Sequence, residues 1–241
     1  MKPLIAAAAV FVLAAAAAIV FLLGRHGETG SDAFDGAYPL VTAAPTGVPA
    51  LTWRPTGTPA GPLPAFPGAG SKVSGRAVNR NVGISYARLG APWRATATRT
   101  GDPSSGMEIN GKIKDYKHFW YASVSVEPLD TKLDVPGAQR LRAAAELTGQ
   151  AFVKELYSGD GTRKDLAGAA LTVDHHPGWV TAFRMTHTTD LDRVEKSQTE
   201  VVVAVDTGRR LPAIVEITIP GNQNRLLPDI THVVRSLRVV R

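Results

Sequence analysis

The sequence predicts an α+β domain, in which helices flank an antiparallel β-sheet, preceded by one N-terminal transmembrane helix and a disordered linker. Three observations carry this prediction: an unbroken apolar run near the N-terminus, a Pro/Gly-rich stretch without apolar periodicity, and paired strand-like segments with two amphipathic helical stretches. Strand-like segments joined by short turns indicate antiparallel pairing. The expected parts are a transmembrane helix at 1–24, a linker at 25–74 and a folded domain at 75–241.

The apolar run extends from Leu4 to Leu23, twenty residues with no polar interruption. A helix of that length matches the hydrocarbon core of a bilayer, about 30 Å thick. A cleavable signal peptide has a shorter apolar region of about 7–15 residues, so an uncleaved signal anchor is expected; a cleaved signal is the alternative. Lys2 before the run, and acidic residues soon after Arg25, favour a cytoplasmic N-terminus and an extracytoplasmic C-terminal domain in the cell membrane.

The stretch 25–74 contains eight of the seventeen prolines and eight glycines, and its apolar residues follow neither strand nor helix spacing. Such a segment cannot bury enough surface to offset the entropy of ordering it, which predicts a disordered tether. A plain spacer is favoured over a proline-rich ligand because no PxxP motif with basic flanks is present.

The expected elements of the folded domain follow in order. Residues 83–93 (GISYARLGAPW) form a short apolar segment ended by a proline turn, and 119–129 read as a strand because they are rich in β-branched and aromatic residues. Pro136 and Gly137 are expected to open a long helix, which ends at SGDG (158–161). Two strand pairs follow, 168–174 with 178–187 and 199–206 with 212–219, and a short helix begins at Pro228.

Three signatures carry a family resemblance: LGAPW (89–93), VDTG (205–208) and the C-terminal pattern IPG…LLPDI…SLRV. With the order of elements, they resemble actinobacterial single-pass membrane proteins of unknown function that are similar in plan to the Mog1/PsbP-like group, which includes LpqN-type lipoproteins. The resemblance covers roughly residues 76–241. It implies a central antiparallel sheet with helices packed on it, and it transfers no catalytic residue. This chain departs from the lipoproteins because it has no cysteine to carry a lipid.

Composition excludes several kinds of site. Without cysteine there is no disulfide, zinc–thiolate centre or thiol nucleophile. The net charge is +6, and beyond residue 75 there are 23 basic and 18 acidic residues, scattered among one another along the chain. Nucleic-acid binding is not expected, because no clustered basic stripe with interleaved aromatic residues is visible. The net positive charge is better interpreted as a weak attraction to an anionic membrane or wall surface.

No catalytic motif emerges. GMEINGKI (106–113) has the spacing of a phosphate-binding loop, but Ile113 stands where Ser or Thr must reach Mg²⁺, and a glycine-containing surface loop is expected instead. After Asp190 and Asp192, the acidic cluster DLDRVE (190–195) lacks the third early ligand, the central glycine and the glutamate at the end of a full calcium loop, so a solvated connection is expected. His232 is expected on the exposed side of the last helix.

The stretch DHHPGW (174–179) poses the question of a metal site, a catalytic base or a turn. Apolar strands on both sides favour the tip of a β-hairpin with His175 and His176 as its central pair. The aromatic side chains allow a cleft for glycan or lipid, but core packing is favoured. The surface or cleft candidates are His175, His176, Trp93, Trp120 and Trp179.

The function expected from the sequence is that of a membrane-tethered, extracytoplasmic, non-catalytic domain with a binding or accessory role in the cell envelope. No metal, cofactor or catalytic residue is assigned, and an enzyme is the less favoured class. The expected partners are the membrane itself, through the N-terminal helix, and an envelope protein or cell-wall component. A cell-envelope hydrolase and a carrier of an apolar ligand are the alternatives.

Overall fold

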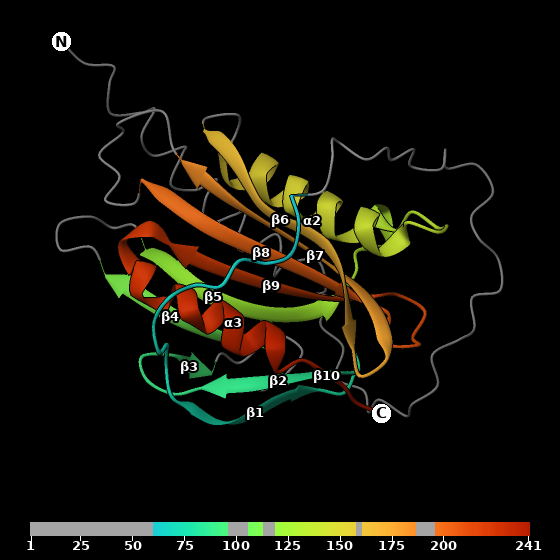
Figure 1. The fold of residues 1–241 in the computed structure, drawn as a ribbon, viewed down its shortest axis with the longest axis horizontal. Helices are drawn as coiled ribbons and strands as arrows, with labels where there is room; N and C mark the ends of the chain where they lie inside the picture. Colours follow the sequence, from blue (N-terminus) through green and yellow to red (C-terminus); the bar gives the residue numbers. More distant parts are fainter. Residues whose placement is uncertain (1–59, 96–105, 113–118, 158–160, 187–195) are drawn as a thin grey trace, which may run out of the picture. The chain divides into compact units, whose positions relative to one another are not determined.

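The computed structural model describes residues 60–95, 106–112, 119–157, 161–186 and 196–241 (Figure 1). The predicted transmembrane helix, the first part of the linker and the acidic cluster 190–195 lie outside these residues. Within the described ranges, no helix combines the length and the apolar character needed to cross a membrane.

A seven-stranded, fully antiparallel sheet forms the centre of the fold, with the strand order β3-β4-β5-β9-β8-β7-β6 (Figure 1). Its strands are β3 (Arg94–Ala95), β4 (Gly106–Lys112), β5 (Phe119–Pro128), β6 (Thr162–Val173), β7 (His176–Thr186), β8 (Ser197–Val205) and β9 (Ala213–Pro220). A smaller antiparallel sheet of order β1-β2-β10 combines β1 (Val73–Asn79), β2 (Ile84–Leu89) and β10 (Arg238–Val239). The predicted strand pairs are confirmed.

Two α-helices lie on opposite faces of the large sheet: α2 (Arg140–Tyr157) and α3 (Leu227–Arg235). Along β8, Val202 and Ala204 pack with α2, whereas residues 201, 203 and 205 belong to the core that includes α3. Short 3-10 helices, η1 (Thr131–Leu133) and η2 (Gly221–Leu226), precede α2 and α3. The predicted class, an antiparallel sheet flanked by helices, is confirmed, and β8 is apolar on both faces because both are covered.

Two local predictions need correction. Residues 106–112, expected to be a surface loop, form β4 and pair with β5 along their whole length. A phosphate-binding loop is thereby excluded, since it must leave a strand and enter a helix. Helix α2 begins at Arg140 and not at Pro136, because Gly137 has φ +127°, which no helical residue adopts.

Part of the predicted tether lies on the folded domain. Residues 60–72, here called the strap, run along the α3 side of the large sheet (Figure 1). The Gly61 carbonyl accepts a hydrogen bond from the Gly168 N–H of β6 (2.8 Å), and Leu63 and Phe66 pack against the core. The linker prediction is therefore wrong for residues 60–74. The strap has no periodicity because it is neither helix nor strand, and its prolines and glycines follow an irregular path.

The β6–β7 hairpin is confirmed, but its turn lies one residue earlier than predicted. Asp174 (φ 47°) and His175 (φ 69°) form the turn, and His176 is the first residue of β7, paired with Val173. Aspartate tolerates a positive φ better than most residues. Its carboxylate is also used: Asp174 Oδ2 accepts the Val239 N–H (2.9 Å), which ties the hairpin tip to β10.

Candidate functional site

A buried carboxylate in α3 holds the strap against the domain. Asp229, in the first turn of α3, is 1% exposed. It accepts hydrogen bonds from the backbone N–H of Ser71, from Ser71 Oγ (2.8 Å) and from Trp93 Nε1 (2.7 Å). These donors satisfy a buried charge that would otherwise destabilise the fold. Two of the signatures, LGAPW and LLPDI, therefore meet at one contact.

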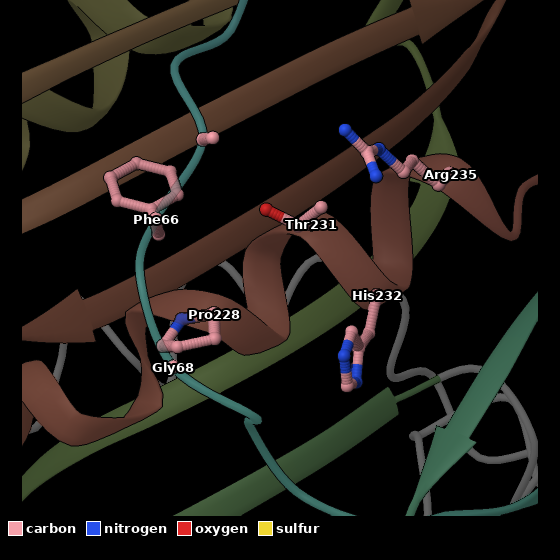
Figure 2. Close-up of a pocket in the computed structure, with 7 residues that line it drawn as sticks. Phe66, Gly68, Pro228, Thr231, His232 and Arg235 are labelled. Atoms are coloured by element: carbon pink, nitrogen blue, oxygen red, sulfur yellow. The ribbon is translucent and has the colours of Figure 1, made fainter.

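A hollow of about 320 Å³ lies between the strap and α3, here called the α3 groove (Figure 2). Phe66 faces Thr231 and Arg235, which project from α3 toward the strap, while His232 projects to the other side of the helix (Figure 2). The residues that line it are Ala65, Phe66, Gly68, Pro228, Thr231, His232 and Arg235.

The α3 groove has unused hydrogen-bonding capacity. Thr231 Oγ1 and His232 Nδ1 are buried, and neither has a hydrogen-bond partner among the described residues. Buried polar atoms in native proteins nearly always have a partner, so the unpartnered Thr231 Oγ1, which faces the strap, marks a place where a bound group or water fits. His232 is half-buried, which corrects the expectation that it lies on the exposed side of the helix.

The strap approaches α3 too closely for side chains at two positions. A Cβ at Gly68 would lie 2.9 Å from Pro228 Cγ, and one at Gly70 would lie 3.1 Å from His232 Cε1. Both glycines also have positive φ values, 122° and 65°, which favour glycine. The glycines that suggested disorder in the sequence are thus what allows the strap to form one wall of the groove.

A second polar group is buried on the α2 face of the large sheet. Glu200 in β8 is fully buried; its Oε2 accepts from Thr218 Oγ1 (2.7 Å) and Gln198 Nε2 (3.4 Å), while Oε1 has no partner among the described residues. Burial raises the pKa of Glu200 well above its ordinary value, and the nearby carboxylate of Glu216 raises it further. Burial therefore favours the neutral form of the Glu200 carboxyl.

A pair of neighbouring carboxyl groups is typical of the acid–base pairs in hydrolases. Glu200 and Glu216 share one face of the sheet, because Glu200 pairs with Thr218, two residues from Glu216 along β9. The Glu200 side chain has no exposed surface, however, so a substrate could not reach it. Glu200 was not predicted as a distinct position; the available signal was a single glutamate directly before the apolar run VVVAV (201–205).

The sequence-based candidates do not converge. His175 is exposed at the hairpin tip and His176 is half-buried at the start of β7. Trp93 is buried on the α3 side, in contact with Asp229. Trp179 is half-buried against α2, with the Arg142 guanidinium 5.2 Å from its ring centroid. The side chain of Trp120 lies outside the described residues.

Metal binding gains no support from this part of the chain. Across the described ranges, no three His, Asp or Glu residues are grouped so that they could hold an ion.

No family model matches the chain, and no curated protein matches it. Among solved structures, it is similar to cyanobacterial PsbP (CyanoP) from Synechocystis sp. PCC 6803, with a TM-score of 0.43 and 15% identity over 74% of this chain and 99% of that chain. It is also similar to the E65A mutant of the protein Mog1, with a TM-score of 0.40 and 13% identity over 66% of this chain and 91% of that chain.

These neighbours are of the two types that the sequence resemblance names.

Proposed function

We propose that this chain is a membrane-tethered, extracytoplasmic binding domain of the LpqN-like, actinobacterial type, which recognises an envelope partner through the α3 groove. In this proposal the run Leu4–Leu23 is a signal anchor with a cytoplasmic N-terminus, and the role of the domain is accessory and non-catalytic.

The observation that supports binding is the composition of the α3 groove. Phe66 and Pro228 offer apolar surface, and Thr231 and Arg235 offer hydrogen-bond donors that face the strap. An apolar wall with a few polar groups is the usual composition of a recognition site. A partner segment with an apolar side chain next to a carbonyl or carboxylate would complement it.

The two alternative functions are less well supported by the geometry. A carrier would need space between sheet and helix, but α2 lies so close to the sheet that a Cβ on Gly149 would be 2.9 Å from Phe183 Cε1. A hydrolase would need an accessible acid, and Glu200 is fully buried.

Site-specific photocrosslinking in cells tests the binding proposal. A photoreactive phenylalanine analogue replaces Phe66 in the groove, and the same analogue at Gln150, exposed on α2, is the matched control. We expect a discrete crosslinked product from position 66 and none from position 150. Equal products at both positions, or none at 66 in a folded protein, would contradict the proposal.

Membrane location is tested separately. Protease added to intact spheroplasts should remove the folded domain if it lies outside the cytoplasm. Complete protection of the domain, with cleavage after lysis as the control, would rule out the proposed orientation.

A further inference from the structure

The net positive charge of the described residues comes from one part of the fold. Residues 60–95 contain five basic residues and no acidic residue, and residues 221–241 contain four basic residues and one acidic residue, Asp229. All other described residues together contain eleven basic and eleven acidic residues. The whole net positive charge of the described chain thus belongs to these two segments, here called the basic layer.

The two segments lie together in the fold although they are far apart in sequence. β10 pairs with β2, and Ser71 of the strap donates to Asp229 of α3. Figure 1 shows α3, the strap and the small sheet on the same side of the large sheet, opposite α2. The single acidic residue of the layer is buried and is bonded to Ser71 and Trp93, so it does not neutralise the surface.

The charges of the basic layer are exposed to solvent. Each of its nine basic residues is exposed: Lys72, Arg76, Arg80, Arg88, Arg94, Arg225, Arg235, Arg238 and Arg241. Partial burial, and after it the neighbouring charge of Arg238, lower the pKa of Arg76, so these two cations are close enough to repel each other. The carboxylate of Asp174 offsets the charge of Arg238, because its Oδ1 lies 3.5 Å from Arg238 Nε.

An apolar side chain accompanies these charges. Val73 is 48% exposed, and no other large hydrophobic residue is exposed among those whose side chains the structure describes. Val73 and Arg76 lie in β1 and Arg238 lies in β10, and both of these strands pair with β2. Arg76 and Arg238 are neighbours, because Arg76 Nη2 donates to Ser85 Oγ (2.9 Å) and Ser85 pairs with Arg238. The small sheet thus carries an exposed valine and two exposed arginines.

From this arrangement we infer that the basic layer docks the domain onto an anionic lipid surface, with Val73 entering the headgroup region. Basic side chains near an anionic bilayer are attracted to its surface potential, and an apolar side chain adds selectivity for a membrane over a dissolved anion. The inference rests on the proposed membrane anchor, since residues 24–59 connect Leu23 to the strap and keep the domain near the bilayer.

The absence of cysteine makes a direct test possible, because one introduced cysteine is the only thiol in the full chain. The full chain carrying Val73→Cys is labelled with a polarity-sensitive fluorophore and reconstituted into vesicles of phosphatidylglycerol or of phosphatidylcholine. Gln150→Cys, exposed on α2, is the control site.

We expect the probe at position 73 to report an apolar environment in phosphatidylglycerol only, and to return to an aqueous signal at 1 M salt, where the Debye length is about 3 Å. The probe at position 150 should report water in both lipids. Identical spectra at position 73 in both lipids, or a response to soluble polyphosphate but not to phosphatidylglycerol, would overturn membrane docking.

Charge variants provide the second measurement. Replacing Lys72, Arg88 and Arg235 by Gln should lower the ratio of docked to undocked protein on the order of 100-fold. Replacing Lys132, Lys154 and Lys164 by Gln removes the same charge from exposed positions outside the layer and should leave the ratio within about threefold. Equal effects of the two triple variants would overturn the role of the layer.

Failure of the anchor is distinguishable from failure of docking. If the chain had no transmembrane anchor, it would not sediment with phosphatidylcholine vesicles at high salt. Docking is measured separately, as the difference in fluorescence of the probe at position 73 between the two lipids at low salt.

Discussion

Trp93 and Trp179 are chemically identical side chains with different hydrogen bonds. Trp93 Nε1 donates to the buried carboxylate of Asp229 at 2.7 Å, whereas Trp179 Nε1 is buried without a partner among the described residues. The Trp93 N–H stabilises a buried charge. The Trp179 N–H is buried because its ring packs at the α2 interface, and it has no such role. Aromatic type alone therefore does not separate a cleft residue from a core residue.

Replacing Trp93 by Phe is expected to destabilise the protein by about 1–3 kcal/mol beyond the loss of packing, since a buried carboxylate loses a donor. Trp179→Phe is the matched control, because it removes a similar volume and no hydrogen bond. Urea unfolding followed by circular dichroism measures both. Equal losses in the two variants would show that the Trp93–Asp229 hydrogen bond does not contribute to stability.

Glu200 links stability to pH in a direction opposite to that of a salt-bridged carboxylate. Burial, reinforced by Glu216, raises its pKa in the folded state above that of the unfolded chain. Its contribution to stability is therefore fully present below the ordinary carboxyl pKa. It is lost as the pH rises from there through the raised folded pKa.

Glu200→Gln keeps the shape of the side chain and removes its titration. We expect the variant to have a higher melting temperature than the natural protein at pH 8, with the difference shrinking toward pH 4. Melting followed across that range in one series of buffers measures the effect. A difference that is constant with pH would mean that Glu200 does not titrate differently in the folded and unfolded chain.

At the scale of the element, the β6–β7 hairpin shows why a turn is harder to place than the strands on either side. The apolar residues of both strands are visible in the sequence, but DHHPGW offers two adjacent pairs for the turn. The contact between Asp174 Oδ2 and the Val239 N–H, from a strand distant in sequence, is made only with Asp174 in the turn.

The two possible turns make opposite predictions. Replacing Asp174-His175 by Asn-Gly should stabilise the protein by about 1 kcal/mol, because Gly relieves the positive φ of His175 and Asn can still accept from Val239. Replacing His175-His176 by Asn-Gly places glycine in β7, where it costs roughly 0.5–1 kcal/mol. Thermal unfolding of the two variants side by side distinguishes the registers; the reverse order of stability would contradict the observed turn.

At the scale of the whole molecule, the strap decides where the folded domain begins. Leu63 and Phe66 pack on the core, and Ser71 provides two of the three donors to Asp229. These contacts assign residues 60–72 to the domain, and the α3 groove is formed by its first and last segments, the strap and α3.

Shortening the chain tests this assignment. A chain that begins at Ala60 should keep the stability of the folded domain, whereas one that begins at Val73 should lose about 3 kcal/mol or more from lost apolar burial and from the exposed carboxylate of Asp229. Urea midpoints of the two chains give the comparison. Equal midpoints would mean that the strap contributes no stability.

The sequence by itself determined what depends on the spacing of neighbouring residues. The alternation of β8 and β9, the helical spacing of α2 and α3 and the β6–β7 hairpin all follow from local patterns, and each is found close to its predicted position. β4 was missed because its glycines and polar residues lack that alternation; its strand form depends on pairing with β5.

Only the tertiary structure decided which distant residues meet. Ser71 and Asp229 are 158 positions apart, and Trp93 and Asp229 are 136 apart, so no local pattern connects them. The same holds for the basic layer: its charges look scattered along the chain, and they gather because β10 and α3 pack beside β2. Burial, pairing and the sum of charge on a surface are properties of the folded chain, because each depends on which segments share a space.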